Sequence, residues 1–266
     1  MAIAEAEDFR AESDALHRLL VQLDDGDFAR PTGFKGWTIN DVLTHLYFWN
    51  QMARFQLTDE AKLIARMKAA MDAPAGFRAF EGGNCDDLAG RALLEAWHGD
   101  VQATADQYTG ADPKRRLKWV GPDMSARSSI TARLMETWAH GQAVYDELGV
   151  RRDDADRIRN IVVLGVNTYG WTFKNRKQVP PGEMPYLVLT APSGAVWTYG
   201  AESETERIEG PATAFCQVVT QTRNIADVPL VVTGPAATAW MANAQCFAGP
   251  PNDPPPPGLR KIKEPA

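Results

Sequence analysis

The chain has 266 residues, which is enough for one large domain or two smaller ones, and its 44% hydrophobic and 23% charged content is typical of globular proteins. The formal net charge of −6 argues against nucleic acid as the main partner, because phosphate binding requires a basic face. The N-terminal residues do not resemble a signal peptide, and no apolar run approaches the ~20 residues of a membrane span. Three scattered cysteines without a CxxC pair fit a reducing compartment. We therefore expect a cytoplasmic protein without a membrane partner.

The chain up to residue 178 has the apolar spacing of amphipathic helices. Thr38 opens one of them, because Asp41 follows three residues later and the two side chains resemble a capping box. Helices are predicted over residues 5–24, 37–58, 62–71, 87–108, 125–148 and 153–174, with a glycine-rich loop at 74–84.

A change of pattern follows the Pro180-Pro181-Gly182 cluster, which predicts a domain boundary. Short β-prone runs then alternate with helical segments, and prolines dominate the tail, which we expect to be disordered or extended. The predicted fold class is α+β, with a helical bundle over residues 1–178, a small α/β domain over 179–248 and a proline-rich tail over 249–266. Within the small domain, strands are predicted at 185–190, 195–199, 206–209 and 229–233, and helices at 211–222 and 236–247.

Three residues are candidate metal ligands. Glu136 and His140 are four residues apart on one predicted helix, so both side chains can face one ion. The same spacing is also common in surface ion pairs, and alone it is a weak signal. His45 lies beside the hydrophobic positions of another predicted helix and can face the pair if both helices share a bundle. A buried, hydrogen-bonded core histidine is the alternative interpretation.

Two segments carry a family resemblance. Residues 36–46 (GWTINDVLTHL) and 131–141 (TARLMETWAHG) resemble the two signature regions of the DinB/YfiT-like superfamily. They are most similar to the metal-binding domain of mycothiol-dependent maleylpyruvate isomerases and their uncharacterised relatives. This resemblance implies a DinB-like four-helix bundle, an appended α/β domain, and His45, Glu136 and His140 as ligands of one divalent metal.

Such a ligand set has chemical consequences. Two imidazoles and one carboxylate leave coordination positions open, as in catalytic sites. Zinc is the first expectation, and iron, nickel or manganese suit the same donors. The resemblance also implies a low-molecular-weight thiol as a cosubstrate.

Several residues near the ligands in sequence, or in the second domain, are candidates for supporting roles. Arg133, one turn before Glu136, can bind a substrate carboxylate or pair with Glu136, and Arg127 heads the same helix. A plain salt bridge explains either arginine equally well. Trp49 is a candidate substrate contact, although a core position is the more usual role for such a residue. By resemblance to the isomerases, Arg207 and Arg223 are candidates for an arginine that the second domain contributes to the site.

Three functions fit these residues. The first is a metal-dependent isomerase or transferase that adds a metal-activated thiol to a small electrophilic substrate. The second is a metal-hydroxide hydrolase or hydratase that needs no thiol. The third is a non-catalytic metal-binding protein whose bundle the metal stabilises. In each case the expected partner is a small molecule or the metal, and the chain is expected to be a monomer or a homodimer.

Overall fold

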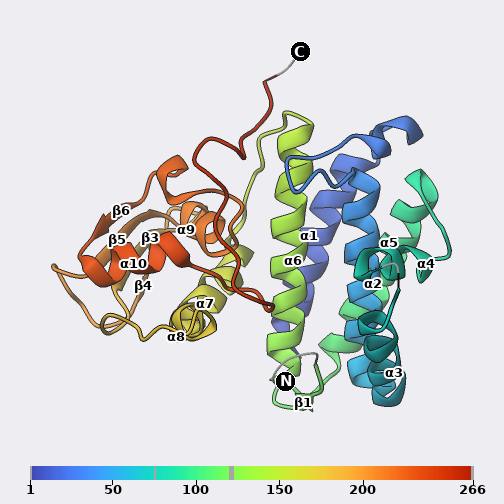
Figure 1. The fold of residues 1–266 in the computed structure, drawn as a ribbon, viewed down its shortest axis with the longest axis horizontal. Coiled ribbons are helices and arrows are strands. Elements are labelled where there is room, and N and C mark those ends of the chain that lie inside the picture. The colour runs from blue at the N-terminus through green and yellow to red at the C-terminus, as the bar shows by residue number, and fades with distance from the viewer. Residues whose placement is uncertain (1, 75, 120–122, 265–266) are drawn as a thin grey trace. The chain divides into compact units, whose positions relative to one another are not determined.

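The computed structural model of the chain describes residues 2–74, 76–119 and 123–264. The chain forms two compact units, Met1–Glu147 and Leu148–Ala266. The elements of the first unit are α1 (Ala4–Leu20), a 3-10 helix (Asp25–Ala29), α2 (Ile39–Thr58), α3 (Glu60–Met71), α4 (Phe77–Gly83), α5 (Gly90–Thr109), β1 (Arg116–Leu117), β2 (Met124–Ser125) and α6 (Ala126–Glu147). Figure 1 labels the six α-helices and β1.

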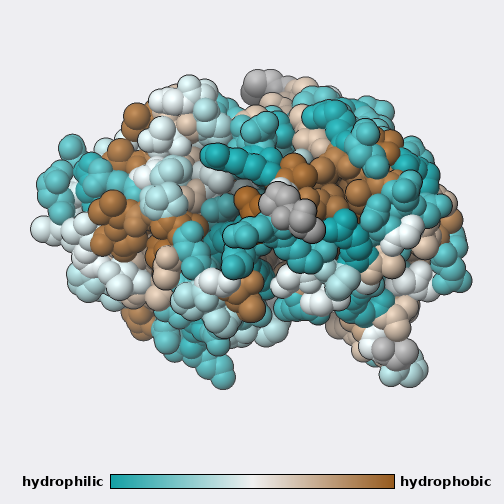
Figure 2. Space-filling view, turned by 90° about the horizontal axis from the view of Figure 1, so that it is seen from above, coloured by the Kyte–Doolittle hydropathy of each residue, from teal (hydrophilic) through white to brown (hydrophobic). Residues whose placement is uncertain are grey.

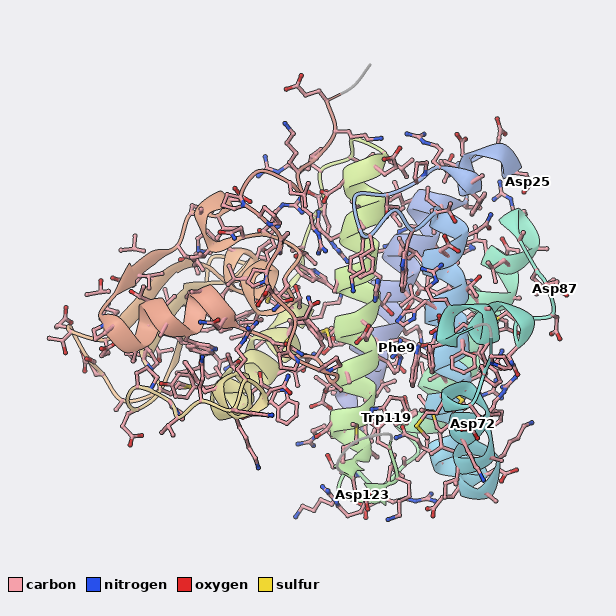
Figure 3. The ribbon with its side chains drawn as sticks, in the orientation of Figure 1. Phe9, Asp25, Asp72, Asp87, Trp119 and Asp123 are labelled. Carbon is pink, nitrogen blue, oxygen red and sulfur yellow. The ribbon has the colours of Figure 1, made fainter. Side chains whose placement is uncertain are left out.

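Four long helices make a bundle in the first unit (Figure 1). α1 packs against α5 and α6, and α2 packs against the same two helices. The core between them is made of buried apolar side chains such as Phe9 of α1, which Figure 3 labels. Because α2 and α6 are neighbours, residues on their facing sides come together although the sequence separates them by about 90 positions.

The start of α2 is fixed by a complete capping box. The Thr38 hydroxyl accepts a hydrogen bond from the Asp41 amide at 3.1 Å, and the Asp41 carboxylate accepts one from the Thr38 amide at 2.8 Å. Two of the amide groups that a helix start leaves without partners are thus satisfied. The predicted cap is confirmed, and it sets the helical register that carries His45.

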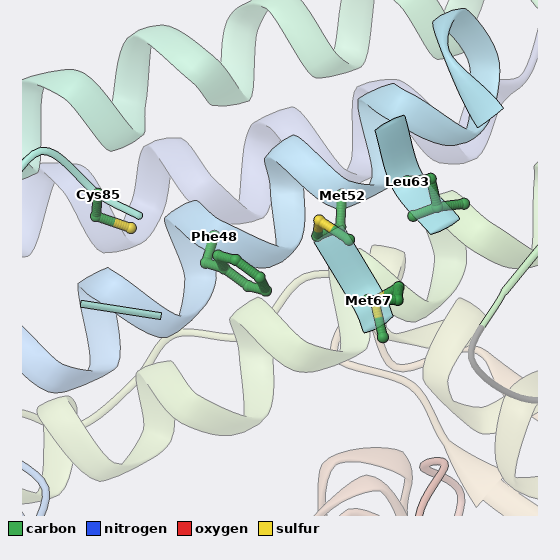
Figure 4. Packing of buried hydrophobic residues seen from close by; sticks show 5 residues of the cluster. All are labelled: Phe48, Met52, Leu63, Met67 and Cys85. Carbon is green, nitrogen blue, oxygen red and sulfur yellow. The ribbon is translucent and has the colours of Figure 1, made fainter. Parts of the chain in front are cut away.

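Between α2 and α5 the chain makes an excursion through α3 and α4. A small apolar cluster holds it against α2, with Phe48 and Met52 from α2, Leu63 and Met67 from α3, and Cys85 after α4 (Figure 4). The sequence predicted a loop over 74–84, and α4 corrects that prediction. Gly82 and Gly83 lie inside this short helix and Gly76 precedes it. Because glycine has low helix propensity, packing rather than local preference stabilises the helix.

The second unit contains a four-stranded mixed sheet with helices. Its strand order is β4-β3-β5-β6, with β3 antiparallel to β4, parallel to β5, and β5 antiparallel to β6. Every strand and helix predicted for the α/β domain over 179–248 has a counterpart within a few residues. The elements are a 3-10 helix (Asp156–Ile158), α7 (Arg159–Asn167), α8 (Tyr169–Asn175), β3 (Tyr186–Thr190), β4 (Val196–Tyr199), β5 (Arg207–Pro211), α9 (Ala212–Val219), a 3-10 helix (Ile225–Asp227), β6 (Val231–Thr233) and α10 (Pro235–Asn243).

Two features of the second unit differ from the predictions. The single helix expected over 153–174 is divided at Thr168 into α7 and α8. Because α7 packs against α9 and α8 against α10, both belong to this unit, and the units divide after Glu147 rather than at the expected residue 178.

The proline-rich tail is extended but anchored, since Asn252 donates to Gln221 at 2.6 Å.

The fold class is mostly helical with a small mixed sheet, as predicted. Among the described residues, no helix is both long and apolar enough to span a membrane. The face in Figure 2 is a mixture in which hydrophobic groups are bordered by hydrophilic residues.

Removing the cap of α2 provides a test of this architecture. Thr38→Ala is expected to lower the free energy of unfolding by about 1 kcal/mol, because the Asp41 amide loses its acceptor. Urea denaturation followed by circular dichroism measures the change. Thr38→Ser retains the hydroxyl and is the matched control, so equal stability of the two variants would contradict the role of the cap.

Candidate metal centre

Three side chains from α2 and α6 converge in the first unit. His45 lies on α2, and Glu136 and His140 lie one turn apart on α6. One ligand atom from each lies within 4.8 Å of the others, and among the described residues no other group of this kind occurs. Glu136 Oε2 lies 3.1 Å from His140 Nε2 and 3.6 Å from His45 Nε2. The structure thus brings together the three residues that the sequence proposed as ligands.

The charge states of Glu136 and His140 suit a cation. Burial alone raises the pKa of Glu136, but its close contacts with His140 and His45 outweigh burial and hold the pKa well below its usual value. Burial lowers the pKa of His140, and the Glu136 contact offsets only part of that effect. Burial also lowers the pKa of His45, yet contacts with Glu136 and Glu81 raise it overall. A carboxylate anion therefore lies beside a His140 imidazole that favours its neutral, ligating form.

Aromatic rings surround the His140 side of the centre. The Trp37 ring stacks on the His140 imidazole with centroids 5.4 Å apart and planes 3° from parallel. Phe34 meets the same imidazole edge to face at 4.9 Å. The Arg78 guanidinium covers Trp37 at 4.0 Å from the ring centroid. These contacts restrict rotation of the His140 ring.

Arg133 is buried beside the centre. Its Nε donates to Asn50 Oδ1 at 3.2 Å, and its side chain is almost fully enclosed. Among the residues that the structure describes, its Nη2, the Asn50 amide nitrogen and the Thr137 hydroxyl have no hydrogen-bond partner. Burial lowers the pKa of Arg133, and the charge of Glu136 partly offsets this. The structure places Arg133 near Glu136 without a direct ion pair between them among the described contacts.

The remaining predicted site residues have the following positions. Trp49 donates its indole N–H to Glu81 at 2.9 Å and lies near Trp119 (labelled in Figure 3), with ring centroids 5.1 Å apart. Arg127 is exposed and pairs with Glu5 of α1 at 3.3 Å. Arg207 and Arg223 belong to the second unit. Arg207 pairs there with Glu209 at 2.8 Å, and buried Arg223 donates to the Thr222 carbonyl at 2.9 Å. Substrate or catalytic roles for these four residues stay predictions.

Glu81 is the residue of the centre that sequence reasoning missed. It comes from α4, is 3% exposed, and its Oε1 lies 2.9 Å from His45 Nδ1. Its segment was expected to be a loop, so no helical face pointed to it. The available signal was the position of Glu81 among aromatic and glycine residues. A carboxylate is costly to bury without a partner, so burial of this segment would have indicated a partner for Glu81.

Comparisons with known proteins identify the family of the chain. Residues 9–145 match the family described as the mycothiol maleylpyruvate isomerase N-terminal domain. That match covers half of the chain and nearly the whole first unit, so the chain belongs to this family of helical-bundle proteins. Its relatives include uncharacterized proteins from two strains of Mycobacterium tuberculosis, each 40% identical over 92% of this chain and 95% of theirs.

Solved structures share the fold. The crystal structure of the mycothiol-dependent maleylpyruvate isomerase matches with a TM-score of 0.53 and 17% identity, over 82% of this chain and 88% of that one. A histidine mutant of that isomerase matches with the same TM-score and 16% identity. The match therefore extends beyond the bundle, and at these identities it establishes the fold.

The cysteine near the centre provides a test of local burial. Cys85 is buried between α2 and α4, and burial raises the pKa of its thiol to about 12. Because the thiolate is the reactive form, labelling by iodoacetamide at neutral pH is expected to be about three orders of magnitude slower in the folded chain than in the unfolded chain. Peptide mass spectrometry measures labelling, with Cys85→Ser as the control. Rapid labelling of folded protein would contradict this burial.

Proposed function

We propose that this chain is a metal-dependent enzyme that acts on a small electrophilic substrate with a low-molecular-weight thiol, in an isomerisation or a thiol transfer. The observation that carries the proposal is the convergence of three ligand atoms within 4.8 Å at a site that is not sealed. The His45, Glu136 and His140 side chains keep 15%, 23% and 11% of their surfaces exposed. A fully enclosed four-ligand structural site differs on both counts.

The donor set fits a divalent metal. Two imidazole nitrogens and one carboxylate oxygen suit zinc, and they also suit iron(II), nickel or manganese. We take zinc as the first candidate, held by His45, Glu136 and His140. When bound, such an ion lowers the pKa of a coordinated water or thiol and polarises a carbonyl group.

The side chains around the ligands support this role. Trp37 and Phe34 hold the His140 ring in one orientation through their ring contacts. The buried charge of Arg133 favours the ionised form of Glu136. In this proposal Arg133 and Arg127 are candidate catalytic residues, with Arg133 the better placed of the two. Trp49, Arg207 and Arg223 are candidate substrate contacts.

The choice of a thiol rests on the relatives. The family description and the solved structures both name a mycothiol-dependent isomerase, and mycothiol is therefore the first thiol to test. The 40% identical mycobacterial proteins are uncharacterized and add no substrate.

Metal binding is tested by removing a ligand. His140→Ala is expected to lower zinc affinity by more than about 100-fold, because losing a ligand weakens metal binding more than losing a residue that only orients a ligand. Saturating zinc is expected to raise the melting temperature of the native chain but not that of the variant, since zinc stabilises only the folded state that binds it. Chelator competition and calorimetry measure both effects. His17→Ala on α1 is the matched control, and zinc affinity that survives His140→Ala would contradict the ligand assignment.

Thiol dependence is tested by turnover. The zinc-loaded chain is expected to convert electrophilic carbonyl or alkene substrates only when mycothiol or another small thiol is present. Glu136→Gln removes one anionic ligand and is expected to abolish that conversion while the circular dichroism spectrum is retained. Turnover without a thiol would instead favour a hydrolase or hydratase, and zinc binding with no turnover of any kind would favour a non-catalytic role.

A further inference from the structure

A buried carboxylate lies behind the His45 ligand. Glu81 Oε1 is 2.9 Å from His45 Nδ1, on the side of the imidazole away from Glu136. The same oxygen accepts a hydrogen bond from the Trp49 indole nitrogen at 2.9 Å. Trp49 follows His45 by one turn of α2, so both donors come from one face of that helix.

The direction of these hydrogen bonds follows from the chemistry of the groups. The Trp49 indole is only a donor, so Glu81 Oε1 is an acceptor in that contact. A carboxylate oxygen has room for a second donor, and His45 Nδ1 supplies it when that nitrogen carries the proton. A neutral imidazole has one N–H, and placing it on Nδ1 leaves the lone pair on Nε2. That nitrogen is the one 3.6 Å from Glu136.

The position of Glu81 is set by the docking of α4 on α2. Phe77 stacks on Trp49 with ring centroids 5.7 Å apart, and Arg78 pairs with Asp41 at 2.6 Å. Along α2, the Arg78 contact lies one turn before His45, and the Phe77 contact is with Trp49 itself. The carboxylate is therefore held where it meets His45, and its burial is compensated by two donors.

We propose that Glu81 is a positioning residue that selects the His45 tautomer with a proton on Nδ1 and thereby prepares Nε2 as a metal ligand. Trp49 holds the Glu81 carboxylate in place. The tautomer selection is a property of the chain alone, whereas its consequence for metal affinity rests on the function proposed above. Outer carboxylates that orient a ligating histidine typically change metal affinity 10- to 100-fold.

The experiment compares Glu81→Ala and Glu81→Gln with a matched control. Asp100→Asn is that control, because Asp100 is another buried carboxylate that bonds to α2, through Arg54 at 2.6 Å, but contacts no ligand. The first readout is the protonation of the His45 ring nitrogens, by nitrogen-15 NMR of the metal-free chain under conditions in which His45 is neutral. The second readout is zinc affinity by chelator competition.

In the native chain we expect the proton on Nδ1. Glu81→Ala is expected to shift it towards Nε2 and to lower zinc affinity about 10- to 100-fold. Glu81→Gln retains an acceptor oxygen and is expected to preserve the tautomer with a smaller loss of affinity. Asp100→Asn is expected to leave both readouts unchanged. Trp49→Phe, which removes only the indole donor, is expected to give a partial shift and serves as the variant of choice if Glu81→Ala does not fold.

Three outcomes would overturn the inference. They are an Nε2 proton in the native chain, an unchanged tautomer and affinity when Glu81 is replaced, and an equal loss of affinity in Asp100→Asn. Failure of the native chain to bind zinc refutes the proposed function instead, and the tautomer measurement still decides the role of Glu81.

Discussion

The packing of α2 against α6 is the constraint on which the rest of the first unit depends. It places His45 beside Glu136 and His140, and it also encloses Arg133. Enclosing a carboxylate and a guanidinium is costly unless opposite charges compensate each other. The low pKa of Glu136 shows that its two imidazole partners and Arg133 outweigh the effect of burial. The interface between α2 and α6 therefore accommodates these buried polar side chains because Glu136, its two imidazole partners and Arg133 compensate one another.

The two imidazoles of the centre are held by different means. His140 shares a helix with Glu136, whose Oε2 lies 3.1 Å from its Nε2, and its ring is enclosed by Trp37 and Phe34. His45 is the only ligand from α2, and its orientation comes from hydrogen bonding to Glu81. Packing restricts a ring without distinguishing its nitrogens, whereas a hydrogen bond to Nδ1 does distinguish them. In the proposed arrangement, the short helix α4 supplies this contact on the α2 side.

Much of the architecture was predictable because it is encoded by local patterns. The Thr38 capping box, the long amphipathic helices and the spacing of Glu136 and His140 depend on neighbours within one or two turns. The break at Thr168 and the helix that carries Glu81 were not predictable in this way. Each depends on packing against an element that is distant in sequence, α9 and α10 in the first case and α2 in the second. The pairing of His45 with the α6 residues needed the family resemblance for the same reason.

All the residues of the centre lie within the first unit. The ligands, Glu81 and the aromatic enclosure fall between residues 34 and 140, inside both the compact unit and the region that matches the family. If the proposed metal site is correct, metal affinity is expected to depend on contacts among α2, α4 and α6. The second unit has its own sheet and buried core. In the proposed function Arg207 and Arg223 are candidate substrate contacts and not ligands, so replacing them is expected to change turnover and to leave zinc affinity unchanged.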